Sequence, residues 1–144
     1  MKVVASNRRA RFDYEIIETI EAGLQLTGPE VKSCRLGHVQ LTGAYVSILH
    51  GRPVLKHAKI AAYVKATGVE QIPERDRPLL MKASEIARLQ TVLAEKGLTV
   101  VPLEVRAAKF IKVVLGIGRG RKKQDKRQKI REREVGRQLR EGRE

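Results

Sequence analysis

The sequence predicts a mainly β fold: a closed or nearly closed antiparallel barrel of six strands with two or three short helices and a basic C-terminal tail. Short segments of alternating apolar residues, separated by turn sequences, predict the strands. The strand–helix–strand repetition of parallel sheets is missing. The last 29 residues carry +7 of the net charge of +14 and hold only four aliphatic side chains, so we expect a tail that is disordered in the free protein.

The N-terminal part of the chain predicts an arm, a strand and a helix. Residues 1–11 form a basic arm that carries three arginines, Arg8, Arg9 and Arg11. Alternation from Phe12 to residue 26 predicts a strand with a bend or bulge at residues 21–23. Pro29 suits the first position of a short helix, and Gly37 suits the residue after its last turn.

The middle of the chain predicts a hairpin, a loop and a second helix. Residues 39–49 and 53–60 alternate as two strands, and His50-Gly51 between them is typical of a tight turn. The polar stretch 65–78 contains three Gly or Pro residues and predicts a loop. Ser84 is the expected N-cap of a helix that runs to about residue 96.

Two further strands precede the tail. The segment 98–106 contains Pro102, which favours an edge or a bulge because proline cannot donate a ladder hydrogen bond. The segment 110–117 alternates cleanly. We interpret Gly116-x-Gly118-x-Gly120 as a flexible hinge, so that residues 1–118 form the folded domain and residues 119–144 the tail.

The sequence lacks the signatures of a catalyst or a metal protein. The three histidines have no metal-ligand spacing with one another or with Cys34, which we expect to be a small core residue. No acid, base and nucleophile motif is present, so we expect a binding protein without a cofactor. A single cysteine and the lack of a secretory signal or apolar span favour a reducing cytoplasm.

The charge indicates a polyanionic partner. Nucleic acid is favoured over a membrane surface, because Val135 and Leu139 give the tail only one apolar pair. Aromatic residues make up 3% of the chain and tryptophan is missing, so phosphate contacts and shape are favoured over base stacking.

Several segments, taken in order, resemble one family along nearly the whole chain. They are NRRARFDY (7–14), EAGL (21–24), LTGPEVKSCR (26–35), LTGAY (41–45), IAAY (60–63), LLMK (79–82), GLTVVPL (97–103), KVVLG (112–116) and DKR (125–127). The chain is thereby similar to the SmpB family, the SsrA-binding proteins of bacterial trans-translation. The order and separation of the EVKS-x-R and DKR segments are the specific part of this resemblance.

The resemblance implies a six-stranded barrel of the oligonucleotide-binding (OB) type. It also implies binding to the tRNA-like domain of transfer-messenger RNA (tmRNA, or SsrA) and delivery of this RNA to stalled ribosomes. There the tail would become helical and probe the decoding centre and the empty mRNA channel of the small subunit. Elongation factor Tu and alanyl-tRNA synthetase would be indirect partners through the same RNA, and the protein would be a monomer in the RNA complex.

The resemblance also implies site residues. The expected tmRNA contacts on the folded domain include the arginines of the arm. They are Asn7, Arg8, Arg9, Arg11, Glu21, Lys32 and Arg35. In the tail the expected contacts with the decoding centre are Gly120, Arg121, Lys122, Asp125, Lys126 and Arg127. Arginine and lysine suit phosphate contacts, whereas Glu21 suits hydrogen bonds from base amino groups or a 2′-hydroxyl. The alternative stays open that these residues make no RNA contact. Glu21 at a strand bend, and Lys32 with Arg35 on a helix, can simply be solvated surface residues.

The tail departs from the family at two positions. Gln124 stands where relatives often have His or Tyr, and Val135 stands where an aromatic residue is usual. Each change removes a ring that could stack on a base, a contact of about 1–3 kcal/mol where it exists.

Two other functions fit parts of the sequence. A general OB-type RNA-binding or ribosomal protein with a basic tail fits the composition equally well, and it differs by showing no preference for a tRNA-like RNA. A rescue factor that hydrolyses peptidyl-tRNA would need a Gly-Gly-Gln loop, and the sequence contains none.

Overall fold

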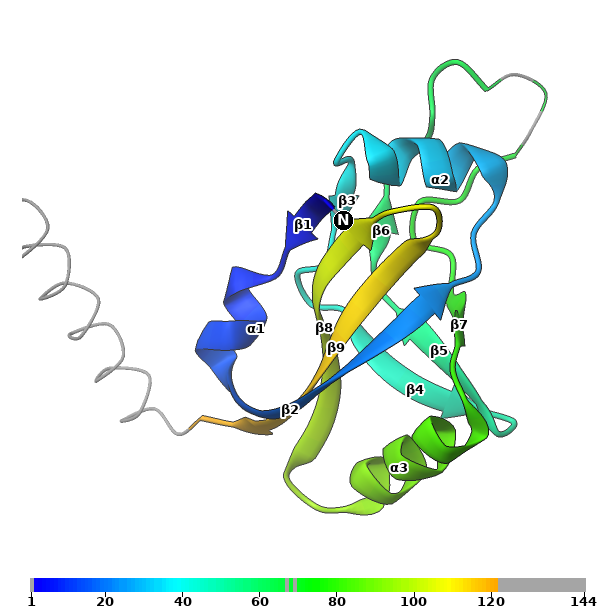
Figure 1. Ribbon diagram of the computed structural model, residues 1–144. Helices are drawn as coiled ribbons and strands as arrows, with labels where there is room; N and C mark the ends of the chain where they lie inside the picture. The colour runs from blue at the N-terminus through cyan, green and yellow to red at the C-terminus, as the bar shows by residue number, and fades with distance from the viewer. Residues whose placement is uncertain (1, 67, 69, 122–144) are drawn as a thin grey trace, which may run out of the picture.

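The computed structural model describes residues 2–66, 68 and 70–121. In this part of the chain nine strands and three short helices form the fold (Figure 1). The helices are α1 (Arg8–Asp13), α2 (Gly28–Arg35) and α3 (Ala83–Ala94). The strands are β1 (Lys2–Ser6), β2 (Tyr14–Leu24), β3 (Val39–Gln40), β4 (Tyr45–Leu49), β5 (Arg52–Lys56), β6 (Lys59–Ile60), β7 (Arg77–Leu80), β8 (Leu98–Ala107) and β9 (Ile111–Gly120). The predicted mainly β, antiparallel class with few helices is confirmed.

Seven strands form one antiparallel sheet in the order β1-β8-β9-β2-β7-β5-β4, and β3 pairs with β6 separately. The sheet curls until β4 contacts β8, but no ladder joins these two strands within the described residues. The predicted closed or nearly closed barrel of six strands is therefore confirmed only as a curled antiparallel sheet: within the described residues the ladder does not close, and the sheet has seven strands instead of six. One reason is that β1 pairs with the outer edge of β8, from Lys2 opposite Ala107 to Ser6 opposite Glu104.

The main core fills the inside of the curled sheet. Val100, Val105, Val113 and Leu115 of β8 and β9 are completely buried there. Two helices lie at opposite ends of the sheet: α2 at the top of Figure 1 and α3 at the bottom. They contribute their buried faces to the same core, with Cys34 from α2 and with Leu89 and Val92 from α3. Burial of Cys34 confirms its predicted place in the core.

A second, smaller core lies on the outer face of the sheet beneath α1. Ala10 of this helix packs with Val101, Leu103 and Val114, and Tyr14 and Ile16 border them. The predicted basic arm is therefore partly wrong, because residues 2–13 are a paired strand followed by a helix. The burial of Ala10 beside the exposed Arg8 and Arg9 explains why this short helix docks with its charges outward.

Strand β9 runs through the segment that we predicted to be a hinge. Gly116 and Gly118 are buried and paired with β2 and β8. A Cβ at Gly116 would lie 2.8 Å from Leu103 Cδ1, and one at Gly118 would lie 2.9 Å from Tyr14 Cβ. These glycines permit close packing, so the hinge interpretation is wrong and the folded part extends to Gly120.

The predicted position of the hairpin turn was correct, whereas the predicted lengths of the neighbouring strands were not. The hairpin turn at His50-Gly51 is confirmed, with φ angles of 52° and 76°. The predicted strand 53–60 is instead interrupted at His57, whose φ is 63°, and this divides it into β5 and β6. The predicted strand 39–49 likewise divides into β3 and β4, and the predicted loop 65–78 already contains the first residues of β7.

The two predicted irregularities of the long strands have different outcomes. Pro102 lies at a register shift in β8, which confirms the predicted bulge, although β8 is an inner strand between β1 and β9. In β2 the shift lies between Ile16 and Glu18. The predicted bend at residues 21–23 is wrong, because Glu21 and its neighbours pair continuously with β9.

Candidate nucleic-acid interface

Asn7 is a buried residue that holds α1 on the body. Its Oδ1 accepts a hydrogen bond from the backbone N–H of Ala10 at 3.1 Å, which makes it the N-cap of α1. Its Nδ2 donates to the carbonyl oxygens of Leu41 at 3.1 Å and Pro102 at 2.9 Å. Only 3% of the residue is exposed. The structure therefore places Asn7 beneath the predicted interface and not on its surface.

The three arginines of α1 are exposed, as an RNA contact requires. Arg9 donates from Nε to Asp13 Oδ2 at 3.0 Å, and its guanidinium carbon lies 5.7 Å from the centre of the Phe12 ring. Arg11 lies 3.9 Å from Glu104 on β8. These exposed pairs are weak, so phosphate groups can compete for the guanidinium groups at small cost.

Glu21 belongs to a row of alternating charges on the outer face of the sheet. Its carboxylate lies 3.5 Å from Arg106 Nη1 and 3.2 Å from Lys112 Nζ. Arg106 also contacts Glu104 at 3.2 Å, and Glu104 leads on to Arg11. The row connects α1 with β8, β9 and β2. Two cations neutralise Glu21, so it can lie near phosphate groups without net repulsion.

Sequence reasoning did not identify Arg106 and Lys112 as site residues. The signal that could have found them is the hairpin register, because residues 106 and 112 face each other across β8 and β9. Glu21 lies beside them because β2 pairs with β9 at Val114 and Lys112. Cross-strand neighbours of opposite charge are the usual stabilising arrangement on an exposed sheet face.

Lys32 and Arg35 lie on α2 with exposed side chains. Lys32 Nζ lies 5.5 Å from the centre of the Tyr63 ring. Arg35 donates from Nη2 to the carbonyl oxygens of Ala108 at 2.9 Å and Lys109 at 3.3 Å. Arg35 thus connects α2 to the β8–β9 turn, which brings the predicted residues of α2 toward the row that contains Glu21.

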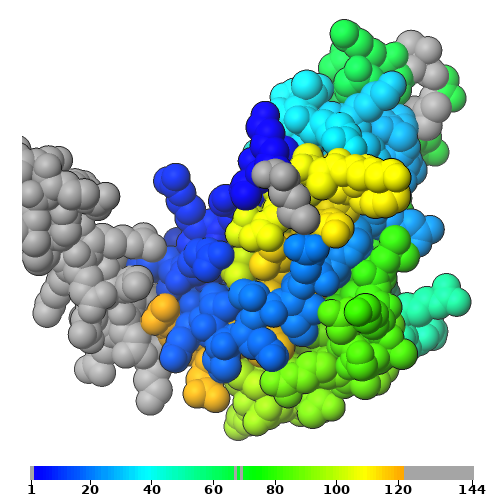
Figure 2. Space-filling view, in the orientation of Figure 1, coloured from blue at the N-terminus to red at the C-terminus, as the bar shows by residue number. Residues whose placement is uncertain are grey.

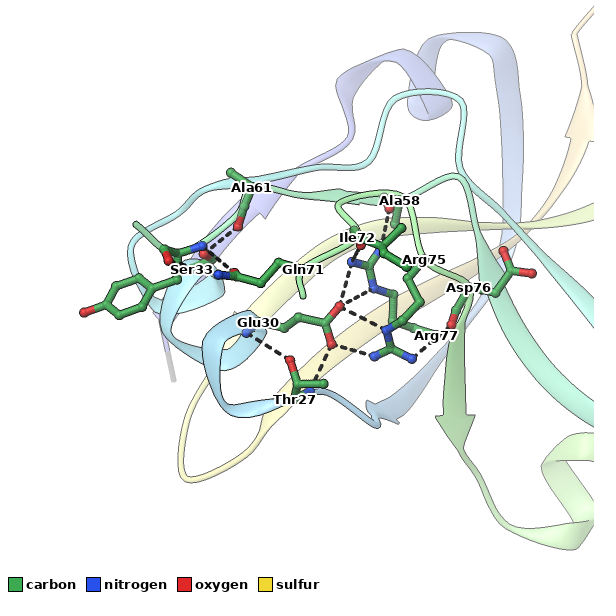
Figure 3. Close-up of polar contacts among 11 residues, drawn as sticks. Thr27, Glu30, Ser33, Ala58, Ala61, Gln71, Ile72, Arg75, Asp76 and Arg77 are labelled. Atoms are coloured by element: carbon green, nitrogen blue, oxygen red, sulfur yellow. Dashed lines mark hydrogen bonds and ion pairs between the residues drawn. The ribbon is translucent and has the colours of Figure 1, made fainter. Parts of the chain in front are cut away.

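A buried ion cluster fixes the position of α2 (Figure 3). Glu30 closes a capping box with Thr27 at the helix start: Thr27 N–H donates to Glu30 Oε1 at 2.9 Å, and Glu30 N–H donates to Thr27 Oγ1 at 3.4 Å. Arg77, which is fully buried, donates to Glu30 Oε2 from Nε at 3.0 Å and from Nη2 at 2.7 Å. Arg75 Nη2 donates to Glu30 Oε1 at 2.5 Å.

The surroundings of Glu30 keep it ionised. Burial alone would raise the pKa of this carboxyl group. Hydrogen bonds from Arg75, Thr27 and Arg77, together with the charge of Arg77, outweigh burial and lower the pKa to about 2. Arg77 Nη1 also donates to Ala58 O at 2.6 Å. The helix that presents Lys32 and Arg35 is therefore tied to β7 and to the segment before β6.

Of the six predicted tail contacts, the described part of the chain contains two. Gly120 ends β9 opposite Tyr14, and the N–H of Arg121 donates to Asp13 O at 2.9 Å. The chain thus leaves the body beside α1 (Figure 1). Lys122, Asp125, Lys126 and Arg127 lie outside the described residues, as do Gln124 and Val135.

Figure 2 shows the face formed by the N-terminal elements and the β8–β9 turn, with β2 between them. Within the described residues, no group of three His, Cys, Asp or Glu side chains is placed to hold a metal ion. No described helix is long and apolar enough to cross a membrane. The arrangement on this face suits contacts with an extended polyanion.

A curled antiparallel sheet that carries exposed cations on α1 and α2 has the charge distribution expected of a nucleic-acid-binding class of protein. The family model described as SmpB protein matches residues 4–143, and the chain belongs to the SmpB family. The chain is 47% identical over 136 residues to an SsrA-binding protein of Chlorobaculum tepidum, which covers 93% of this chain and 87% of the relative. It is 47% identical over 144 residues to an SsrA-binding protein of Coprothermobacter proteolyticus, with 97% and 95% covered.

A solved structure is also similar. A chain from the structure described as "tmRNA-SmpB: a journey to the center of the bacterial ribosome" has a TM-score of 0.71 and 43% sequence identity. The match covers 85% of this chain and 87% of that chain. The family resemblance predicted from the sequence segments is confirmed.

Proposed function

We propose that this protein binds the tRNA-like domain of tmRNA and delivers it to stalled ribosomes for trans-translation. The carrying observation is near-full-length similarity to proteins named SsrA-binding protein. In this proposal the OB-type body, through its charged face, holds the RNA. The tail from residue 119 contacts small-subunit rRNA in the decoding centre and the empty mRNA channel. The protein acts as a monomer in the cytoplasm, without catalysis or a cofactor.

The charged face supports binding to a structured RNA. Arg8, Arg9 and Arg11 point outward from α1, and Lys32 and Arg35 from α2. Such residues position a nucleic acid through its phosphates, which carry no sequence information. Glu21 adds an acceptor that can receive hydrogen bonds from base amino groups or 2′-hydroxyls, because Arg106 and Lys112 neutralise its charge locally.

Elongation factor Tu and alanyl-tRNA synthetase are proposed as indirect partners that bind the same RNA. The second candidate function is general RNA binding, which the net charge of +14 favours. The two functions differ in selectivity, since charge alone does not distinguish a tRNA-like domain from an ordinary tRNA.

An equilibrium competition tests the proposal. Labelled tRNA-like domain of tmRNA is bound to the full-length protein at about 0.15 M salt, where non-specific binding of basic proteins falls to roughly 10⁻⁴–10⁻⁶ M. Excess elongator tRNA is then added. We expect the tRNA-like domain to stay bound. Displacement at equal concentrations would establish general RNA binding instead.

Truncation tests the division of labour between body and tail. The cut belongs after Arg121, because β9 pairs with β2 up to Gly120 and Arg121 still bonds to Asp13. We expect the truncated protein to bind the tRNA-like domain nearly as well as the full chain and to lose tagging activity on stalled ribosomes. Loss of RNA binding itself would contradict this division.

A further inference from the structure

The turn between β8 and β9 presents an aromatic ring to solvent. Phe110 is the last residue before β9, and 66% of its surface is exposed. Burying a phenylalanine side chain stabilises a protein by about 1.5–3 kcal/mol, and this ring forgoes most of that gain. Neither the family segments nor the charged row accounts for its position.

The backbone that carries the ring is well anchored. Arg35 of α2 donates to the carbonyl oxygens of Ala108 and Lys109. Within the turn, the N–H of Ala108 donates to Phe110 O at 3.1 Å. The ring is therefore attached to a fixed turn, and ordering it on binding costs little conformational entropy.

The surroundings of the ring are cationic. Lys109 Nζ lies 5.9 Å from the centre of the Phe110 ring. Arg106 and Lys112 form the register pair just below the turn, where both also contact Glu21, and Arg35 approaches from α2. Val3 opposite Arg106 and Leu36 after Arg35 are also exposed, but each adjoins a cation. A ring among positive charges matches a base next to its own phosphates better than the apolar core of a protein interface.

We propose that Phe110 is a stacking platform for one unpaired base of the bound RNA, with Lys109 and Lys112 contacting the adjacent phosphates. This inference rests on the proposed function and adds base stacking to an interface otherwise made of charges. The RNA strand would then pass over the β8–β9 turn, beside the row that contains Glu21.

Fluorescence provides a direct test, because the chain contains no tryptophan. Phe110→Trp places a single indole at the turn, and stacking on a base quenches and shifts its emission. The probe is a transcript of the tRNA-like domain, added to the full-length variant. Leu49→Trp is the matched control: Leu49 is also exposed, but lies in β4 beside the 50–51 turn. We expect quenching at residue 110 and none at residue 49.

Affinity measurements complete the test. Phe110→Ala should weaken binding of the tRNA-like domain about 5- to 150-fold, the loss that stacking on one base predicts. Phe110→Tyr keeps an aromatic ring and should bind the tRNA-like domain as tightly as wild type. The slope of log affinity against log salt should stay unchanged, because no charge is removed. An unchanged unfolding midpoint of Phe110→Ala shows that the loss is not a folding defect, and an exposed side chain makes this the expected result.

Two failures are distinguishable. If wild type prefers the tRNA-like domain to tRNA, but Phe110→Ala binds normally and the indole emission at residue 110 does not change, the stacking proposal is overturned and the proposed function stands. If wild type shows no such preference, the proposed function fails, and the stacking proposal that depends on it fails as well.

Discussion

Arg77 donates from two guanidinium nitrogens to one oxygen of Glu30, at 3.0 and 2.7 Å, although the two residues are 47 positions apart. Arg77 is fully buried and Glu30 nearly so. A buried arginine cannot lose its proton, so its charge requires a partner within the protein. The pair joins β7 to the first turn of α2, and α2 presents Lys32 and Arg35 at the proposed interface.

Glu30→Gln should destabilise the protein strongly. The substitution keeps the shape of the side chain but leaves the buried Arg77 without a counter-charge, which typically costs about 3–5 kcal/mol. Urea unfolding measures the change. The matched control is Glu18→Gln, which removes an exposed pair with Arg88 at 3.2 Å and should cost less than about 1 kcal/mol. Equal effects of the two substitutions would show that the Glu30 cluster is not stabilising.

The same carboxylate predicts an acid-sensitive stability. Folding lowers the pKa of Glu30 from 4.5 to about 2, so the unfolded state binds a proton more readily. The stabilisation is complete above about pH 5 and is lost as the pH falls through 4.5 toward 2. The unfolding midpoint in urea, followed from pH 6 to pH 2.5, should decline over this window. A carboxyl resonance of Glu30 that titrates near pH 4.5 in the folded protein would contradict the prediction.

Close packing of β9 predicts different effects at two glycines. Gly118→Ala would place a Cβ 2.9 Å from Tyr14 Cβ, which is fixed to the backbone and cannot move away easily. We expect a loss of about 1–3 kcal/mol in unfolding free energy. A Cβ at Gly120 would meet no atom within 4 Å, so Gly120→Ala should leave stability unchanged or raise it by up to about 1 kcal/mol. Similar losses at both positions would argue against crowding as the cause.

Cys34 should be unreactive in the folded protein. The side chain is fully buried, and burial raises the pKa of its thiol to about 11. Relative to an unfolded thiol with a pKa of 9.0, the reactive thiolate fraction at pH 8 falls about 100-fold. Labelling with a maleimide should therefore follow the unfolding transition in urea. Rapid labelling under native conditions would place Cys34 outside the core.

Local sequence signals predicted the features that neighbouring residues determine. The start of α2 near Pro29 and its end before Gly37, the turn at His50-Gly51 and the bulge at Pro102 each depend on residues close in the chain. Whether the barrel closes fully could not be predicted, because closure depends on which strand takes the edge of β8, and alternation carries no such information. The glycines of β9 were interpreted as a flexible hinge. They are needed because Leu103 and Tyr14 leave no room for a side chain, and these residues lie far away in the sequence.

The candidate site was predicted unevenly for the same reason. Exposed arginines could be found from charge and family segments, whereas the partners of Glu21 follow from strand register. Arg77 lies in a stretch that reads as a polar loop, and only its distant partner Glu30 explains its burial. Asn7 belongs to a family segment, but that membership does not separate a residue that touches RNA from one that holds the helix in place.

Asn7 and Arg8 are adjacent, and the structure predicts opposite effects for them. Asn7→Ala removes the N-cap of α1 and two hydrogen bonds to Leu41 and Pro102, so it should cost about 1–3 kcal/mol of stability. RNA binding by Asn7→Ala should depend on salt as it does in wild type, since no charge is lost. Arg8→Ala removes an exposed cation and should leave the unfolding midpoint unchanged.

If Arg8 contacts a phosphate, its removal should reduce the slope of log affinity against log salt by about 1. Titrations of the tRNA-like domain at several salt concentrations, paired with urea unfolding of each variant, measure both quantities. A reduced slope for Asn7→Ala with normal stability would move Asn7 to the RNA surface. An unchanged slope for Arg8→Ala would mean that this arginine is only solvated, and that the RNA lies farther along the face toward Glu21 and α2.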